Sequence, residues 1–250
     1  MKLLICGLHG HMGTEVAKLA LSGNFGVEKI VGVDISPAAD RALSDLPCAK
    51  EFSAADAKVD CIVDFSHHSL TNALLAFATK NKLPLVLATT GQTEEEKNAI
   101  EDAAKRIPLF FAPNYSIGVT LLIDLAKRAA EALPNAEIEI VECHHDRKLD
   151  APSGTALALA NALAETRKDA KIVPGRTGAG KREANEIPIH SLRMGNVAGM
   201  HEVILGTNNQ TLTLRHEVHD RAIFAEGALA AAKFLVNKAP GLYSMQDLLS

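Results

Sequence analysis

One short stretch of the 250-residue chain concentrates the side chains that could carry chemistry. From Glu142 to Thr155 it reads Glu-Cys-His-His-Asp-Arg-Lys-Leu-Asp-Ala-Pro-Ser-Gly-Thr. Two imidazoles, a guanidinium and an ammonium group lie within a few residues of one another. Histidine can donate or accept a proton near neutral pH, and the cations can bind carboxylates or phosphates. The stretch therefore predicts a cluster for acid/base chemistry and anion binding.

An Ala- and Leu-rich helix is expected to begin near Gly154, at the end of this stretch. The first backbone N–H groups of a helix lack partners within it, and the helix dipole favours an anion beside them. The N–H groups of Gly154 and Thr155, with the Thr155 hydroxyl, would point at one spot where a carboxylate or phosphate fits. The alternative is a solvated basic loop followed by an ordinary capped helix.

A glycine-rich turn near the N-terminus favours the functional interpretation. Residues Gly7–Gly13 have the spacing G-x-x-G-x-x-G, between an apolar strand-like run and a helical pattern, and Asp34 ends the second apolar run. Such glycines let the backbone approach a pyrophosphate, and an acid at the end of the second strand accepts hydrogen bonds from a ribose. The order of elements predicts a dinucleotide site; a tight turn without a ligand is the alternative.

The acid also indicates which dinucleotide is used. A carboxylate at Asp34 suits a free 2′-hydroxyl and repels a 2′-phosphate, and Ile35-Ser36-Pro37 offer no arginine to bind that phosphate. NADH is therefore favoured, while His11 could partly replace the arginine and leaves NADPH possible.

Apolar runs alternate with helical patterns through the first half of the chain. This alternation predicts an α/β fold with a Rossmann-like doubly wound parallel sheet. Strands are expected at Leu3–Cys6, Ile30–Val33, Cys61–Phe65, Leu85–Ala88 and Leu109–Ala112, and helices at Met12–Ser22, Ala38–Leu46, Leu70–Asn81 and Thr93–Arg106. The last helix carries a capping-box pattern, with Thr93 followed three residues later by Glu96.

After Pro113 the pattern changes to that of a second, α+β domain on a mixed or antiparallel sheet. Three segments alternate apolar and polar residues as half-buried antiparallel strands do. The alternating segments are Ile187–Arg193, Val203–Leu205 and Gln210–Val218; a strand is also expected at Ile138–Cys143, helices at Val119–Leu133, from Gly154 to about Thr166 and at Asp220–Lys238, and a loop at Pro174–Asn185.

Composition excludes several classes of partner. The net charge is −4 and aromatic residues make up only 4%, without tryptophan, so no nucleic-acid surface is expected. The longest apolar run, Val119–Ala126, is interrupted by Asp124 and predicts no membrane span. The start of the chain runs directly into a strand, which predicts no secretory signal. The scattered cysteines are expected to be reduced, as in a cytoplasmic protein with a small-molecule partner.

Four segments together resemble the dihydrodipicolinate reductase (4-hydroxy-tetrahydrodipicolinate reductase) family of the diaminopimelate and lysine pathway. They are residues 7–13, 88–91, 112–116 and 142–155, and the resemblance covers essentially the whole chain. It implies an NAD(P)H-dependent oxidoreductase that reduces a cyclic dicarboxylate and forms a homotetramer. It also implies a dinucleotide-binding domain at 1–116 that is completed by 220–250, and a substrate-binding and oligomerisation domain at 117–219.

The resemblance implies a role for each matching position. His144 would be the catalytic acid/base and Lys148 a proton donor, while His145, Gly154 and Thr155 would hold the substrate. No metal is expected. Cofactor contacts would come from Gly7, Leu8, His9, Gly10, His11, Met12, Asp34, Ala88, Thr89, Thr90, Ala112, Pro113, Asn114 and Tyr115. Two of these positions depart from the family, because His9 and Ala88 stand where glycine is often found.

The sequence does not apportion the proton between His144 and Lys148. Arg147, Lys181 and Arg182 have the charge to contact a carboxylate but could equally face solvent. No role is assigned to the histidines that lack such neighbours, His67, His68, His190 and His201.

Two other functions share the glycine turn. Another two-domain NAD-dependent amino-acid or sugar dehydrogenase has no reason to carry the His-His-x-x-Lys run. A dinucleotide-sensing regulatory protein would keep the turn and Asp34 but dispense with the basic cluster.

Overall fold

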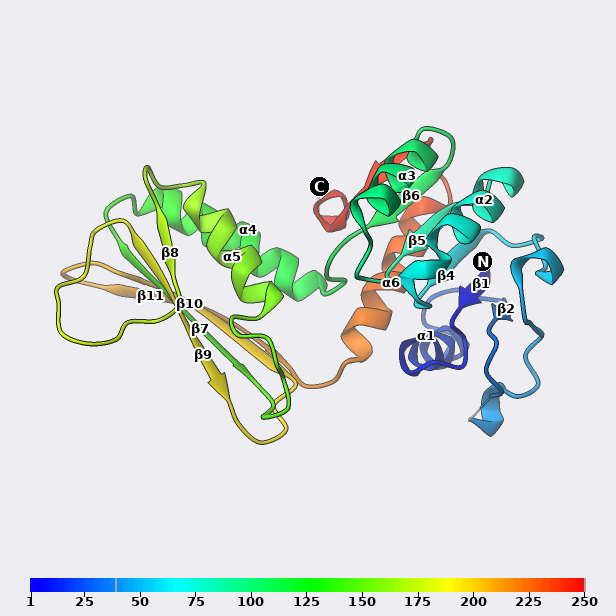
Figure 1. The fold of residues 1–250 in the computed structure, drawn as a ribbon, viewed down its shortest axis with the longest axis horizontal. Helices are drawn as coiled ribbons and strands as arrows, with labels where there is room; N and C mark the ends of the chain where they lie inside the picture. The colour runs from blue at the N-terminus through cyan, green and yellow to red at the C-terminus, as the bar shows by residue number, and fades with distance from the viewer. Residues whose placement is uncertain (39, 250) are drawn as a thin grey trace. The chain divides into compact units, whose positions relative to one another are not determined.

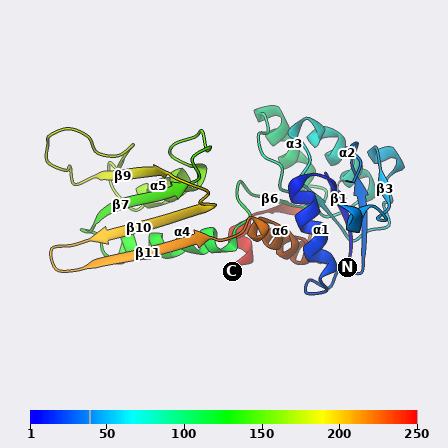
Figure 2. The ribbon, with the colours of Figure 1, turned by 90° about the horizontal axis from the view of Figure 1, so that it is seen from below.

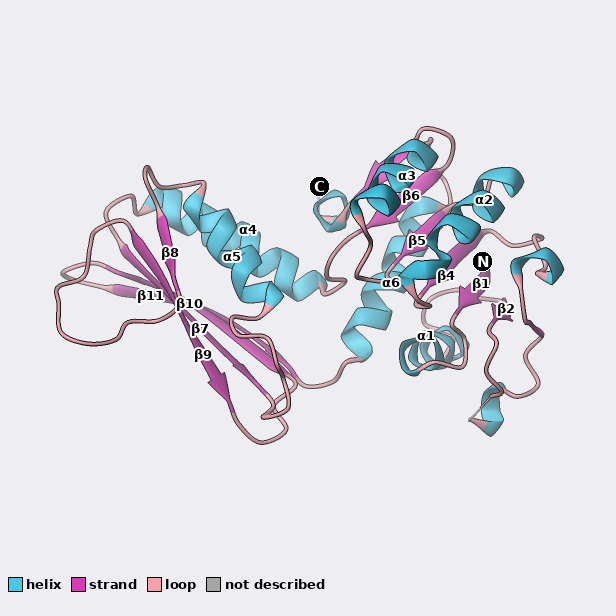
Figure 3. Ribbon diagram, viewed as in Figure 1, coloured by secondary structure: helices cyan, strands magenta, loops and turns pink. Residues whose placement is uncertain are grey.

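The structure is a computed structural model, which describes residues 1–38 and 40–249. The chain forms two compact units (Figure 1). Unit 1 comprises residues 1–116 and 222–250, and unit 2 comprises residues 117–221. Helices and strands alternate in unit 1, whereas most strands of unit 2 follow one another directly (Figure 3).

Unit 1 is built on a seven-stranded sheet in which every pairing is parallel. The spatial order is β12-β6-β5-β4-β1-β2-β3. The strands are β1 (Lys2–Cys6), β2 (Lys29–Val33), β3 (Cys48–Ala49), β4 (Cys61–Asp64), β5 (Leu85–Leu87), β6 (Pro108–Phe111) and β12 (Gly241–Tyr243).

Helices cover both faces of this sheet (Figure 2). The helices α1 (His11–Leu21) and α6 (Ala222–Leu235) lie on one face, and α2 (Thr71–Asn81) and α3 (Glu94–Ala104) lie on the other. Because side chains alternate along a strand, Leu3 and Ile5 of β1 pack with the first pair of helices, and Leu4 packs with the second. Burial on both faces explains why these strands read as unbroken apolar runs. Short 3-10 turns complete the unit at η1 (Arg41–Leu43), η2 (Phe52–Ala54), η3 (His68–Leu70) and η4 (Met245–Leu248).

The strand order reverses beside β1, which pairs with β2 on one side and β4 on the other. In open α/β sheets, ligands bind outside the carboxyl ends of the strands at this reversal. The predicted capping box of α3 is confirmed and holds the helix that follows β5: Thr93 Oγ1 accepts from the Glu96 N–H at 3.2 Å, and the Thr93 N–H donates to the Glu96 carboxylate at 2.8 Å.

Unit 2 has a mixed five-stranded sheet in the order β11-β10-β7-β9-β8. The strand β10 is antiparallel to β7 and β11, whereas β9 is parallel to β7 and β8. Two helices, α4 and α5, pack on one face of the sheet and enclose a separate apolar core. The elements are α4 (Ile117–Ala132), β7 (Glu137–His144), α5 (Gly154–Ala164), β8 (Lys171–Val173), β9 (Glu186–Arg193), β10 (Gly199–Gly206) and β11 (Thr211–Val218).

The predicted fold class is confirmed, with two local corrections. The helix expected at Ala38–Leu46 is wrong, because the described part of this segment holds only η1, which Asp40 caps by accepting the Ala42 N–H at 2.9 Å; Ala39 lies outside the described residues. The segment Ile187–Arg193 pairs parallel rather than antiparallel, since a period of two predicts a half-buried strand but not its direction.

The four cysteines are free thiols. Among the described helices, none combines the length and apolarity that a membrane span requires.

Candidate active site

The glycine turn between β1 and α1 is packed so closely that side chains would not fit. Gly7 has a φ of +74°, and a Cβ there would lie 2.7 Å from the Phe65 carbonyl oxygen. A Cβ on Gly13 would lie 1.9 Å from the Gly7 carbonyl oxygen. Gly10 caps α1 without a side-chain hydrogen bond, which leaves the first N–H groups of the helix for an anion. The turn therefore has the backbone geometry that a pyrophosphate requires.

Asp34 lies directly beside this turn. Its carboxylate accepts the His9 N–H at 2.9 Å and the Ser36 N–H at 2.8 Å, one on each oxygen. Each oxygen retains a lone pair for a ribose hydroxyl. The His9 ring lies 2.6 Å from the Ser36 carbonyl oxygen through Nδ1, so this side chain ties the turn to the loop after β2. Ile35, the residue after the acid, is 84% exposed and offers no charge to a phosphate.

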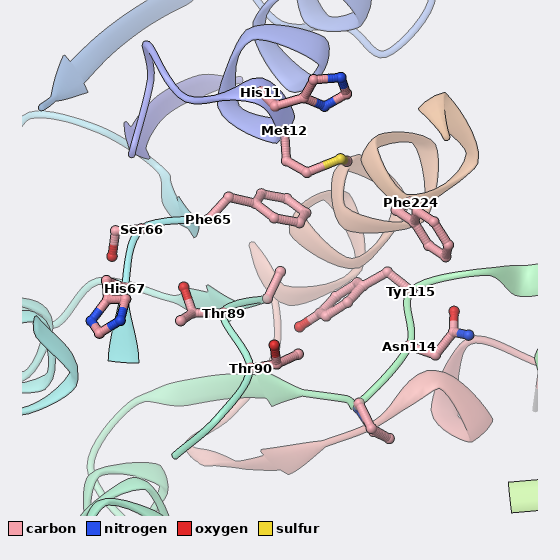
Figure 4. Close-up of a pocket in the computed structure, with 12 residues that line it drawn as sticks. His11, Met12, Phe65, Ser66, His67, Thr89, Thr90, Asn114, Tyr115 and Phe224 are labelled. Carbon is pink, nitrogen blue, oxygen red and sulfur yellow. The ribbon is translucent and has the colours of Figure 1, made fainter. Parts of the chain in front are cut away.

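A cavity of about 590 Å³ lies beyond the carboxyl ends of β4, β5 and β6, next to the start of α1 (Figure 4). Its volume is in the range of small-molecule and cofactor sites. The predicted cofactor residues that line it are His11, Met12, Ala88, Thr89, Thr90, Pro113, Asn114 and Tyr115. Sequence reasoning missed four other lining residues, Phe65, Ser66, His67 and Phe224. A nicotinamide and its ribose fit a cavity of this size and polarity.

Some predicted cofactor residues also serve the core. The side chains of Leu8 and Ala112 are buried in the apolar cluster, so only their backbone atoms can face a ligand. The Tyr115 hydroxyl donates to the Leu87 carbonyl at 2.9 Å and to the Phe110 carbonyl at 3.2 Å. These bonds hold the cavity wall to β5 and β6.

A second acid, Asp64 at the end of β4, was not predicted. It is 1% exposed and accepts the Thr89 hydroxyl at 2.6 Å and the Ser66 hydroxyl at 2.5 Å. Burial raises the pKa of Asp64, and the hydrogen bonds from Ser66 and Thr89 oppose that rise. Since both hydroxyls donate to the acid, they present acceptor lone pairs to the cavity. Its place at the end of an apolar strand, like that of Asp34, was the available signal.

In unit 2, the strand β7 carries the predicted catalytic histidine at its end. Along one face of β7, Ile138 and Ile140 belong to the apolar core, and Glu142 and His144 continue the same face. His144 is 9% exposed, and its Nδ1 lies 2.5 Å from a Glu142 carboxylate oxygen. Burial lowers the pKa of His144, the Glu142 hydrogen bond opposes this, and the charges of Lys148 and Arg193 lower it further.

Sequence reasoning also missed three residues, two of them beside His144 and the third beside His145. Arg193 on β9 donates two hydrogen bonds to Glu142, at 2.8 and 2.9 Å. His201 on β10 lies opposite Glu142 in the sheet, and its ring centroid is 5.1 Å from that of His144. Arg221 places a guanidinium nitrogen 3.3 Å from Nε2 of His145. Strand pairing brings the first two to the site from distant parts of the chain, and no local pattern marks them.

The predicted anion site at the start of α5 is organised by Ser153. The Ser153 hydroxyl accepts the Ala156 N–H at 3.2 Å and lies 3.1 Å from Nε2 of His201, while the Ser153 N–H donates to Glu142 at 3.2 Å. Gly154 faces open space, because no atom lies within 4 Å of a Cβ built there. The structure thus brings the helix start and the His144 cluster together.

Of the other predicted cationic side chains, only Lys148 lies close to His144. Lys148 lies 2.8 Å from Asp150 with its side chain 23% exposed, and its charge acts on His144. Arg147 is 64% exposed and binds Asn196. Arg182 donates to the Ile138 carbonyl at 2.8 Å, so it anchors the loop before β9. Lys181 is exposed.

Comparison with known proteins decides the family. The model of the dihydrodipicolinate reductase N-terminus matches residues 1–115, and the model of the C-terminus matches residues 118–249. The chain belongs to the dihydrodipicolinate reductase family. The function predicted from the resemblance is confirmed, and the chain is an NAD(P)H-dependent oxidoreductase of lysine biosynthesis.

Full-length relatives support this membership. The 4-hydroxy-tetrahydrodipicolinate reductase of Caldanaerobacter subterraneus subsp. tengcongensis is 44% identical over 253 aligned positions, which cover 100% of this chain and 98% of the relative. The 4-hydroxy-tetrahydrodipicolinate reductase of Akkermansia muciniphila is 42% identical over 254 aligned positions, which cover 100% of this chain and 98% of the relative.

Solved structures agree with the fold. The dipicolinate-bound dihydrodipicolinate reductase from Paenisporosarcina sp. TG-14 has a TM-score of 0.81 at 27% identity, with 98% of this chain and 97% of that chain covered. The aspartate dehydrogenase of Thermotoga maritima has a TM-score of 0.54 at 14% identity, and the alignment covers 96% of this chain and 98% of that chain. The second likeness concerns the fold alone.

We expect His201 to make the folded protein sensitive to acid. Burial, assisted by the charge of His144, lowers the pKa of His201 from 6.5 to about 4. The stabilising effect of the neutral ring is complete above about pH 6.5 and is lost as pH falls towards about 4, because only the unfolded chain takes up the proton in that range. The loss amounts to roughly 3 kcal/mol at most. Urea unfolding at about pH 7.5 and about pH 4.5 measures it, and His201→Gln should lose less stability than the wild type.

The exposed His219 provides the matched control, since His219→Gln should lose as much stability as the wild type. Equal losses in the wild type and in His201→Gln would contradict the prediction.

Proposed function

We propose that unit 1 binds NAD(P)H and that unit 2 binds 4-hydroxy-tetrahydrodipicolinate and protonates it, so that tetrahydrodipicolinate is formed. One observation carries the assignment. A buried histidine, His144, is hydrogen-bonded through Nδ1 to an acid and lies in the same cluster as an ammonium group and a helix N-terminus. This arrangement supports a proton donor beside a site for anions.

The residues of unit 1 would hold the cofactor in three parts. The Gly7–Gly13 turn and the start of α1 suit its pyrophosphate, and Asp34 suits its adenosine ribose. The cavity lined by Thr89, Thr90 and Asn114 suits the nicotinamide half. When bound, the reduced nicotinamide supplies a hydride to an unsaturated carbon of the substrate.

The residues of unit 2 would bind the carboxylates and deliver the proton. A negatively charged carboxylate fits the N–H groups at Gly154 and Thr155, with further donors on His145 and Lys148. The Paenisporosarcina relative was solved with dipicolinate bound, which supports a dicarboxylate here. The 4-hydroxyl group leaves as water and gives the conjugated dihydro form, to which the hydride adds at C4. The electrons that the hydride displaces reach the far end of the conjugated system, where His144 or Lys148 supplies a proton.

We also propose that unit 2 mediates assembly into a homotetramer. Both of its helices lie on one face of the sheet (Figure 2). The opposite face carries apolar side chains that are at least partly exposed, among them Val141, Leu192, Met200 and Ile204, and Leu192 is 46% exposed. An apolar sheet face of this kind is typical of a protein interface.

The catalytic assignment predicts a loss of turnover without a loss of cofactor binding. We expect His144→Gln and Lys148→Gln each to lower kcat by about 10²–10⁴-fold, the usual contribution of a general acid. The dissociation constant of NADH, measured by calorimetry, should stay nearly unchanged because both residues belong to unit 2. Lys168→Gln, at an exposed position after α5, is the control and should retain full activity. A collapse of NADH affinity together with kcat would show that the assigned roles are wrong.

The anion site predicts a different kinetic signature. Thr155→Val keeps the side-chain shape but removes a hydroxyl donor to a charged acceptor, a loss of about 1.5–3 kcal/mol or roughly 10- to 150-fold. The same carboxylate is held before and during hydride transfer, so KM should rise while kcat changes little. Inhibition by pyridine-2,6-dicarboxylate should weaken by a similar factor. Thr177→Val, at an exposed position between β8 and β9, should change neither constant. Unchanged inhibition in Thr155→Val would contradict the anion site.

The position of Asp34 predicts the cofactor preference. NADH should be used at least as well as NADPH, because the carboxylate repels a 2′-phosphate and Ile35 cannot bind one. The double variant Asp34→Ala/Ile35→Arg should shift the ratio of kcat/KM values towards NADPH. A wild-type kcat/KM that favours NADPH by tenfold or more would overturn this preference.

A further inference from the structure

The carboxylate of Glu142 lies between His144 and Arg193 and is fully buried. One oxygen lies 2.5 Å from Nδ1 of His144 and accepts an Arg193 nitrogen at 2.9 Å. The other accepts the second Arg193 nitrogen at 2.8 Å and the Ser153 N–H at 3.2 Å. Both oxygens therefore have two partners each, and the carboxylate cannot turn without losing bonds.

These partners are set by strand pairing rather than by a loop. Glu142 and His144 are two residues apart on β7 and share one face of the sheet, and Arg193 lies opposite His144 in the pairing of β7 with β9. The Arg193 guanidinium also donates to the Asp150 carbonyl at 2.6 Å. Arg193 thus connects the acid to the segment that carries Lys148.

The geometry determines which nitrogen of His144 is available. With Nδ1 hydrogen-bonded to an acceptor-only carboxylate, the neutral ring carries its proton on Nδ1 and presents Nε2. Nε2 points to the backbone at Gly199, where a Cβ would lie 3.2 Å away, so the missing side chain leaves room beside this atom. A lone carboxylate would hold the imidazole in its charged form, but Arg193 cancels the charge of Glu142.

We infer that Glu142 and Arg193 are paired positioning residues: Glu142 fixes the His144 tautomer with Nε2 free to exchange a proton, and Arg193 prevents Glu142 from trapping that proton. The inference rests on the proposed function for its catalytic meaning. Neither residue needs to touch the substrate for this role. Each acts through His144.

The other charged and titratable groups around His144 are consistent with this role. Lys148, from the segment after β7, adds a positive charge, and His201 on β10 faces the ring, with His216 on β11 beyond it. Burial lowers the pKa of His201, so that ring adds no charge near neutral pH. For Glu142, burial would raise the pKa, but the hydrogen bonds from Arg193, Ser191 and His144 outweigh it and leave the pKa lowered.

Substituting each partner should move the titration of His144 in opposite directions. In Arg193→Gln, the uncompensated carboxylate should raise the pKa of His144 by about one to two units. In Glu142→Gln, the amide lacks the charge and can donate to Nδ1, so the pKa should fall and the proton should move to Nε2. Nitrogen-15 NMR of labelled histidine, recorded without substrate or cofactor, reports both the pKa and the tautomer. In steady-state assays, kcat of Glu142→Gln should fall about 10²–10⁴-fold, as expected for a wrong tautomer, with KM for NADH unchanged.

Controls separate this role from general support of the fold. Compared with Arg193→Gln, Arg193→Lys restores the positive charge but not the bidentate hydrogen bond to Glu142. The pKa of His144 should therefore return close to the wild-type value. Arg128→Gln, on α4 and 75% exposed, should shift nothing. If Glu142→Gln does not fold, the Arg193→Gln and Arg193→Lys pair still decides the question.

An unchanged His144 pKa in folded Arg193→Gln would overturn the inference, as would shifts in the same direction in both variants. The NMR titration does not depend on turnover. If the wild type fails to reduce the cyclic dicarboxylate, the proposed function fails while the titration still reports on Glu142 and Arg193.

Discussion

The buried carboxylate of Glu142 is the constraint on which the arrangement of unit 2 around His144 depends. Removing an ion from water costs several kcal/mol unless partners replace its hydration. Arg193, His144 and the Ser153 N–H replace it here, and each position has a consequence. Arg193 requires β9 to lie beside β7, and Ser153 brings the start of α5 to the same point. A structural requirement thereby brings together the groups that we propose as the acid/base residue and the anion site.

Unit 1 positions its site with closely packed glycines and with two hydrogen-bonded acids, of which Asp64 is buried and Asp34 is half-buried. Contacts that exclude a Cβ at Gly7 and Gly13 draw the first turn against the sheet, and Asp34 and Asp64 end neighbouring strands on either side of β1. Each acid is held by hydrogen bonds to groups of the site, such as the Thr89 hydroxyl. In both units, the residues with chemistry follow the carboxyl ends of strands, because loops there are free to vary while the sheet positions them.

The elements and residues that a local sequence pattern marks were predicted, whereas those that depend on the pairing of distant strands were missed. The apolar runs of unit 1 and the capping box at Thr93 follow from period and composition and are confirmed. The strands β3, β8 and β12 are two or three residues long, too short to show a period. The helix expected at 38–46 failed because a cap at Asp40 starts only a 3-10 turn in the described residues. Arg193 and His201 reach the site only through strand register, which a single sequence does not reveal.

The central claim is that a dinucleotide turn in unit 1 and the carboxylate-anchored His144 cluster in unit 2 together make one reductase for a cyclic dicarboxylate. The most direct test follows NADH absorbance after addition of the condensation product of pyruvate and aspartate semialdehyde to the wild-type protein. The account predicts a stoichiometric loss of absorbance with that product and none with either precursor alone. No loss with the condensation product, or a loss with an amino acid or sugar instead, would contradict it.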